Sequence, residues 1–211
     1  MINTTATLAR PPNSPATACV SYKPKPILSR ISRASLVHAI AKVRAMDMRQ
    51  KAELIDEVAC SQPNIHACVL VQKRFGVSPE KLNHLLNMML VCFQAMKESE
   101  LVWPVIGVSE IDRHMTAYVE LVKCDEYMAS GARDKKLSRY IDDHPERELF
   151  SYVHEETAHW LTTIVPEYTD KYIMIVAATL VTCIAYAPPM AVMRRSTTLR
   201  MAPMRGIGVM Q

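Results

Sequence analysis

The sequence predicts an all-α fold, a helical bundle of about six or seven helices with disordered basic termini. The 211 residues include only 5 glycines and 6% aromatic side chains, too few for many strands joined by tight turns. Alanine, leucine, methionine, glutamate and lysine, which favour helices, are abundant. Apolar residues also recur every three or four positions through the middle of the chain, which is the spacing of a helix face.

Acidic residues are confined to the middle of the chain, between Asp47 and Asp170. Residues 1–46 carry seven Lys or Arg and no acid, and residues 171–211 carry five and no acid. The formal net charge of +4 therefore combines segments of +7, −8 and +5. This distribution of charge is typical of a folded middle segment whose ends serve in targeting or in docking to a partner. It does not point to any particular enzymatic reaction.

Three parts are expected: a disordered basic tail at 1–28, a helical bundle domain at 29–187 and a second disordered basic tail at 188–211. Residues 1–28 contain five prolines and no acid, and such a segment is not expected to contribute to a hydrophobic core. Its composition leaves open that it is a targeting or secretion leader. The chain has six cysteines and no Cys-x-x-Cys pair, and no secretory signal peptide follows Met1. Reduced thiols and a cytoplasmic location are therefore expected, with a membrane-associated location as the alternative.

The first three helices are expected at 29–46, 47–61 and 64–75. The first is basic and carries apolar residues at helical spacing. Asp47 and Gln50 form the pattern of a capping box at the start of the second. Gly76 is a typical glycine at a helix C-terminus and closes the third.

The best-defined helix begins after Ser78, a predicted N-cap, with Pro79 at its first position. Apolar residues along one side of this helix are spaced alternately by four and three positions, and a second row of apolar residues lies beside the first. A helix that is apolar on two faces belongs in the middle of a bundle. The first row is Leu82, Leu86, Met89, Phe93 and Met96, and the second is Leu85, Met88, Cys92 and Ala95.

Three further helices are expected after Trp103-Pro104 breaks the chain. One starts near Ser109, the next near Asp143, and the last runs from Thr169 to Ala187. The segment 130–143 is rich in charged residues and is interpreted as a polar loop.

Residues 64–90 resemble a degenerate helix-turn-helix, with Gly76 at the turn. The candidate nucleic-acid-binding residues are Lys73, Arg74, Lys81, Asn83 and His84. The pattern departs from the motif at Gln72, where a small residue normally lets the helices approach. An ordinary helical hairpin explains the same residues.

Glu156 and His159 form one Glu-x-x-His pair, the spacing found in di-iron helix bundles. They are the only candidate metal ligands that the spacing selects. Such a site needs a second copy of the pair and two further glutamates, and the chain has no second copy. No cofactor is therefore expected.

Residues 172–193 carry no charge and are long enough to span a bilayer. Pro188-Pro189 shortens the helical part to about 17 residues, the lower limit for a span. A buried core helix is favoured, and a membrane anchor remains the alternative.

The sequence contains no Gly-rich phosphate loop and no Gly-x-Ser-x-Gly element. We therefore expect a non-catalytic helical interaction or regulatory protein that binds a protein partner. Two alternatives stay open: a DNA-binding regulator acting through 64–90, and a membrane-anchored adaptor acting through 172–193. The oligomeric state is not indicated.

Overall fold

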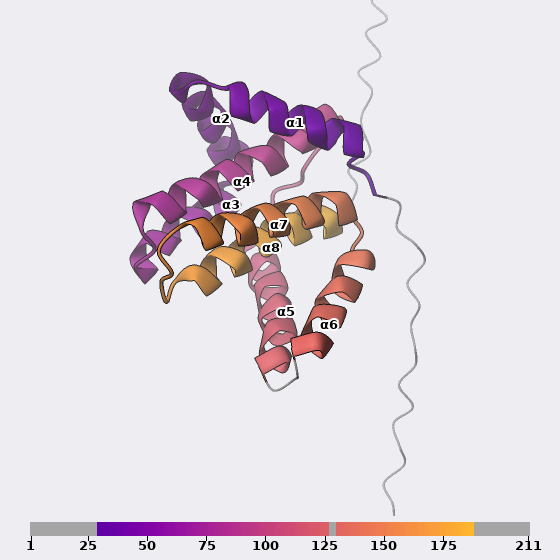
Figure 1. Ribbon diagram of the computed structural model, residues 1–211. Helices are drawn as coiled ribbons and strands as arrows, with labels where there is room; N and C mark the ends of the chain where they lie inside the picture. The colour runs from indigo at the N-terminus through magenta and orange to yellow at the C-terminus, as the bar shows by residue number, and fades with distance from the viewer. Residues whose placement is uncertain (1–28, 127–129, 188–211) are drawn as a thin grey trace, which may run out of the picture.

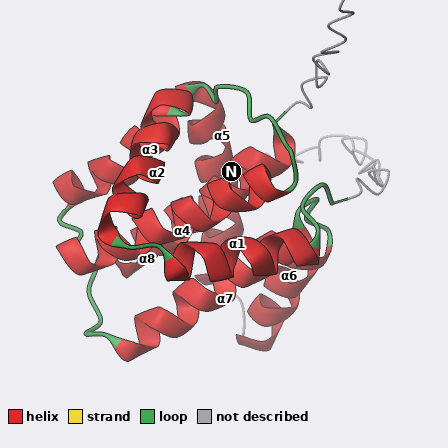
Figure 2. Cartoon of the chain, turned by 90° about the horizontal axis from the view of Figure 1, so that it is seen from above, coloured by secondary structure: helices red, strands yellow, loops and turns green. Residues whose placement is uncertain are grey.

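The computed structural model describes residues 29–126 and 130–187, which form eight α-helices and one 3-10 helix with no strand among them (Figures 1 and 2). The all-α prediction is confirmed. The tails predicted at 1–28 and 188–211 lie outside the described residues. The helices are α1 (Arg33–Ala45), α2 (Met48–Ser61), α3 (Pro63–Leu70), η1 (Val71–Phe75), α4 (Pro79–Glu98), α5 (Val108–Glu126), α6 (Ser130–Asp142), α7 (Arg147–Thr163) and α8 (Asp170–Tyr186).

Helix α4 lies in the middle of the bundle, as its two apolar rows predict. Twelve of its 20 residues are buried, and α1 packs along it on one side while α8 packs on the other. Helices α5 and α7 pack against α8 in turn. Figure 1 shows the resulting order, with α1 and α2 at one side of α4 and α5 and α6 beyond α7 and α8.

Local sequence signals set several helix ends. The Asp47 Oδ1 atom accepts from the Gln50 backbone N–H at 2.8 Å, and the Gln50 Oε1 atom accepts from the Asp47 backbone N–H at 3.0 Å, which is the predicted capping box. Gly76 ends η1 with a φ of +83°, a left-handed conformation that favours glycine. Pro79 occupies the first turn of α4, where no backbone donor is needed.

The prediction of a polar loop at 130–143 is wrong, because Ser130–Asp142 forms α6. Leu137, Tyr140 and Ile141 stand three and four residues apart and give this charged segment one apolar side. The Tyr140 ring packs edge-on against Phe150 of α7 at a centroid distance of 5.4 Å. This helix accounts for the difference between eight α-helices and the six or seven expected.

Helix α8 is a core helix. Eleven of its 17 residues are buried, which agrees with the favoured interpretation of its uncharged sequence. Within the described ranges, no helix combines the length and the apolar character that a transmembrane span needs. Residues 188–193 of the predicted anchor lie outside those ranges.

The buried carboxylate of Glu146 holds the beginning of the described domain, and Arg30 links it to the end of α8. The side chain of Glu146, 1% exposed, accepts hydrogen bonds from the backbone N–H groups of Arg30 and Ile31 at 3.0 and 3.1 Å, and from the Ser29 hydroxyl at 2.7 Å. The Arg30 guanidinium bonds Glu146 and also the last carbonyl groups of α8, between residues 184 and 187. The chain therefore enters and leaves the described domain at neighbouring points.

Candidate interaction surface

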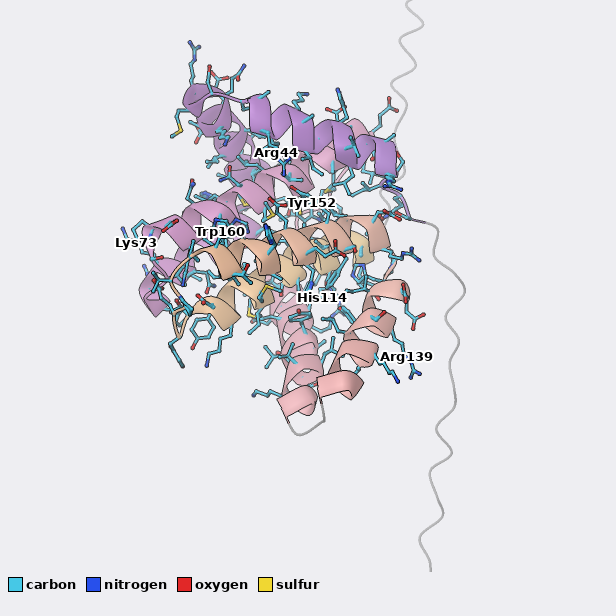
Figure 3. The ribbon with its side chains drawn as sticks, in the orientation of Figure 1. Arg44, Lys73, His114, Arg139, Tyr152 and Trp160 are labelled. Carbon is cyan, nitrogen blue, oxygen red and sulfur yellow. The ribbon has the colours of Figure 1, made fainter. Side chains whose placement is uncertain are left out.

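The structure divides the five candidate nucleic-acid-binding residues between surface and core. Lys73 and Arg74 are exposed on η1, and Lys73 lies at the outer edge of the molecule (Figure 3). Asn83 is exposed on α4, whereas Lys81 and His84 are buried on the same helix. The five side chains therefore do not form one surface.

Lys81 is used inside the protein, where its side chain is 2% exposed. Its Nζ atom pairs with Glu167 at 3.2 Å and with Asp170, and it donates to the backbone carbonyl of Val165 at 3.3 Å. The pKa of Lys81 is raised: burial alone would lower it, and the hydrogen bonds and charges of the two carboxylates outweigh burial. This cluster fixes the connection between α7 and α8 to the first turn of α4.

His84 is part of the packed interior. Its ring stacks on Trp160 of α7 at a centroid distance of 4.1 Å, and its Nε2 atom lies 3.2 Å from the Thr157 hydroxyl. Burial lowers the pKa of His84 to about 4, so the ring is neutral near pH 7.

The predicted metal pair, Glu156 and His159, has no third ligand in the structure. Glu156 lies 3.5 Å from the guanidinium of Arg44, and His159 is exposed on α7. Across residues 29–126 and 130–187, no group of three or more His, Cys, Asp or Glu side chains could hold a metal ion. Glu156 is therefore engaged with α1, whereas His159 faces solvent.

An apolar groove of about 450 Å³ lies where η1 turns into α4. Helix α4 turns Lys81 and Leu85 toward the core, and the residues at positions i, i+3, i+4 and i+7 from Pro79 face the groove instead. Two of these, Leu82 and Leu86, are only partly buried. The full lining is Lys73, Gly76, Val77, Ser78, Pro79, Leu82, Asn83 and Leu86.

The rim of this groove carries a free cation. Lys73 lines it, Arg74 is the next residue along η1, and neither makes an ion pair with any residue that the structure describes. The exposed carboxylate of Glu80 lies at the start of α4, one residue after Pro79. The groove therefore combines apolar walls with unpaired positive charge on its η1 side.

Two other grooves are lined by charges that already have partners. One, of about 410 Å³, lies between α1, α2 and α4, where Lys97 pairs with Glu57 at 2.7 Å. The other, of about 370 Å³, lies between α6 and α7, where Arg147 pairs with Asp142 at 3.7 Å. The groove beside η1 is the most apolar of the three and has the unpaired lysine.

An exposed row of aromatic rings lies at the same end of the molecule. Phe75 of η1 is 60% exposed and packs against Tyr172 of α8 at 6.1 Å, and Tyr172 packs against Tyr168 at 5.9 Å. Sequence reasoning missed this row, because its residues belong to segments about a hundred positions apart.

No known family model matches the chain, and neither a curated protein nor a solved structure matches it significantly.

Proposed function

We propose that the protein is a non-catalytic interaction module that binds an acidic, amphipathic segment of a partner protein in the groove beside η1. The observation that carries this proposal is an apolar groove with an unpaired lysine on its rim. A cytoplasmic location is part of the proposal, and the free thiols of Cys60, Cys68, Cys92 and Cys183 support it.

The walls of the groove suit the apolar side of a partner helix. Leu82 and Leu86 project from successive turns of α4, and Val77 lies at the base of the turn before it. Amphipathic helices bind such grooves through apolar residues spaced by three, four or seven positions. Each anchor that becomes fully buried contributes about 1.5–3 kcal/mol, and association opposes this by several kcal/mol. The balance for two or three anchors is small, so a weak complex is expected, with a dissociation constant of roughly 0.2–1 mM.

Charge selects among such segments. Lys73 at the rim and Arg74 behind it favour carboxylates that flank the apolar anchors and disfavour Lys or Arg there. Because these side chains are exposed, each contributes only about 0.5–1 kcal/mol to affinity. The rim thus determines which amphipathic segment binds, and the apolar walls supply most of the affinity.

The test uses two synthetic helical peptides of about 16 residues with identical leucine anchors, one flanked by Glu and the other by Lys. Fluorescence anisotropy with the full-length protein should show binding of the Glu peptide at least fivefold tighter than the Lys peptide. Lys73→Glu with Arg74→Glu should reverse that order, and Leu82→Ala with Leu86→Ala should weaken the binding of both peptides. The control Lys123→Glu, which reverses an exposed charge on α5, should change neither.

Equal binding of the two peptides, or no binding of either at about 1 mM, contradicts the proposal. DNA binding through 64–90 remains a prediction and is not proposed, because Lys81 and His84 are buried. Salt-sensitive retention of the protein on DNA that Lys73→Glu abolishes would support that alternative instead.

A further inference from the structure

The aromatic row is an exposed surface of unusual chemistry. Tyr168 is 74% exposed and Phe75 is 60% exposed, and beside them Val165 of the connection between α7 and α8 is 77% exposed. The Tyr168 and Tyr172 hydroxyls lie 3.2 Å apart. Phe75 and Tyr168 therefore present apolar ring surface to solvent beside the half-buried Tyr172, and the two phenol groups add polar tips.

The charge around this row is positive. The Lys171 Nζ atom lies 4.1 Å from the centre of the Tyr168 ring and 5.3 Å from that of Tyr172, and Arg74 precedes Phe75. The two carboxylates on the α8 side, Glu167 and Asp170, are both bound by the buried ammonium of Lys81. Lys171 and Arg74 consequently have no carboxylate partner within the described ranges.

We propose that this end of the molecule binds an anionic lipid surface, with Phe75 and Tyr168 entering the interface and Arg74 and Lys171 facing the headgroups. Aromatic side chains with an apolar body and a polar tip favour the boundary between hydrocarbon and water. Lysine and arginine beside them add attraction to anionic headgroups while their stems stay in apolar surroundings.

Two other occupants fit the geometry less well. Single-stranded nucleic acid stacks on flat aromatic platforms, whereas the planes of neighbouring rings here are inclined by 44° and 87°. A peptide needs a groove, and none of the three grooves described above is lined by Phe75, Tyr168 or Tyr172. The row projects from the connection between α7 and α8 and from the end of η1, a placement that suits contact with a planar surface.

The proposal predicts separate effects for charge and for apolar insertion. Each cation near an anionic membrane raises binding by about fivefold, so Arg74→Gln with Lys171→Gln should lower partitioning by roughly 30-fold. Phe75→Ala with Tyr168→Ala should lower it by at least about tenfold, since both ring faces leave water on binding. The control pair Val105→Ala with Lys123→Gln, exposed on other parts of the surface, should leave it unchanged.

The first experiment is cosedimentation of the full-length protein with vesicles of phosphatidylcholine alone or with about 30% phosphatidylserine. The expected result is binding only to the vesicles that contain phosphatidylserine, with the losses given above. Undiminished binding of both double variants would assign any attraction to other basic parts of the chain and overturn the proposal. The proposal would also be overturned if Arg74→Gln with Lys171→Gln weakened binding to an oligothymidine and left binding to the vesicles unchanged.

A second measurement reports depth at a single position and does not depend on the rest of the chain. Relative to the wild type, whose Trp103 and Trp160 set the background, Tyr168→Trp should show added quenching by lipids brominated in their acyl chains, and the matched Val105→Trp should not. Equal added quenching in the two variants, or none in bound Tyr168→Trp protein, would show that the aromatic row does not enter the lipid. Peptide binding in the groove is measured without vesicles, so either proposal can fail while the other stands.

Discussion

Acidification from pH 7.5 to pH 5 should destabilise the protein through two buried histidines. His84 stacks on Trp160, and His144 is 5% exposed among aromatic rings, with its Nδ1 atom accepting from the Glu146 backbone N–H at 3.2 Å. Burial lowers the pKa of both rings from 6.5 to about 4. The unfolded chain therefore binds protons that the folded protein excludes.

The magnitude follows from these pKa values. Below pH 6.5 the unfolded state takes up a proton at each histidine first, so the free energy of unfolding falls as the pH falls, until the folded rings titrate near pH 4. At pH 5, which lies 1.5 below the unfolded value, each histidine lowers the free energy of unfolding by about 2 kcal/mol. The two together lower it by about 4 kcal/mol relative to pH 7.5. His114 and His154, whose pKa values burial also lowers, act in the same direction.

Urea unfolding followed by far-ultraviolet circular dichroism measures this loss directly. The midpoint should fall by roughly 2 M between pH 7.5 and pH 5. His84→Phe keeps a ring against Trp160 but cannot titrate, so it should remove about 2 kcal/mol of the pH dependence. A change below about 1 kcal/mol in the wild type, or an unchanged pH dependence in His84→Phe, would show that the buried histidines do not cause this loss. Glu98, whose pKa is lowered to about 2 mainly by its hydrogen bond with His38, titrates below this pH range.

Three further predictions concern buried groups. Glu146→Ala removes the acceptor of the bonds from residues 29–31 and should lower the melting temperature by roughly 10 °C; a change under about 2 °C would contradict that role. Lys81→Met leaves two partly exposed carboxylates unpaired and should cost about 2 kcal/mol in urea unfolding at pH 7. The difference should shrink as the pH rises through the raised pKa of Lys81, and a constant difference would count against the ion pairs. Cys60 is exposed, whereas burial raises the pKa of Cys92 to about 12. Under native conditions, the number of thiols that react fast with a thiol reagent should therefore fall by one in Cys60→Ser and stay the same in Cys92→Ser.

Signals that act within a few residues could be predicted from the sequence. The capping box of Asp47 and Gln50, the left-handed Gly76 and the position of Pro79 each depend on chemistry within one turn of the chain. The two apolar rows of α4 predicted its central position, and the uncharged sequence of α8 favoured a core helix.

Features that depend on distant partners were missed. Helix α6 was hidden by its charged composition, and its apolar side matters only because Phe150 lies opposite Tyr140. Lys81 was expected at the surface because a lysine without a known partner is usually exposed. It is buried instead, because two carboxylates almost ninety residues away in the sequence pair with its ammonium group. Neither the groove nor the aromatic row could be predicted, since each needs the relative placement of η1, α4 and the start of α8.

Binding of an acidic amphipathic segment in the groove beside η1 is tested most directly by titrating isotope-labelled protein with the Glu-flanked peptide and following the amide chemical shifts. The largest shifts should cluster at Gly76, Val77 and Asn83, and Leu82→Ala with Leu86→Ala should remove them. Shifts centred on α5 or α6, or no shifts at a peptide concentration of about 1 mM, would contradict binding in this groove.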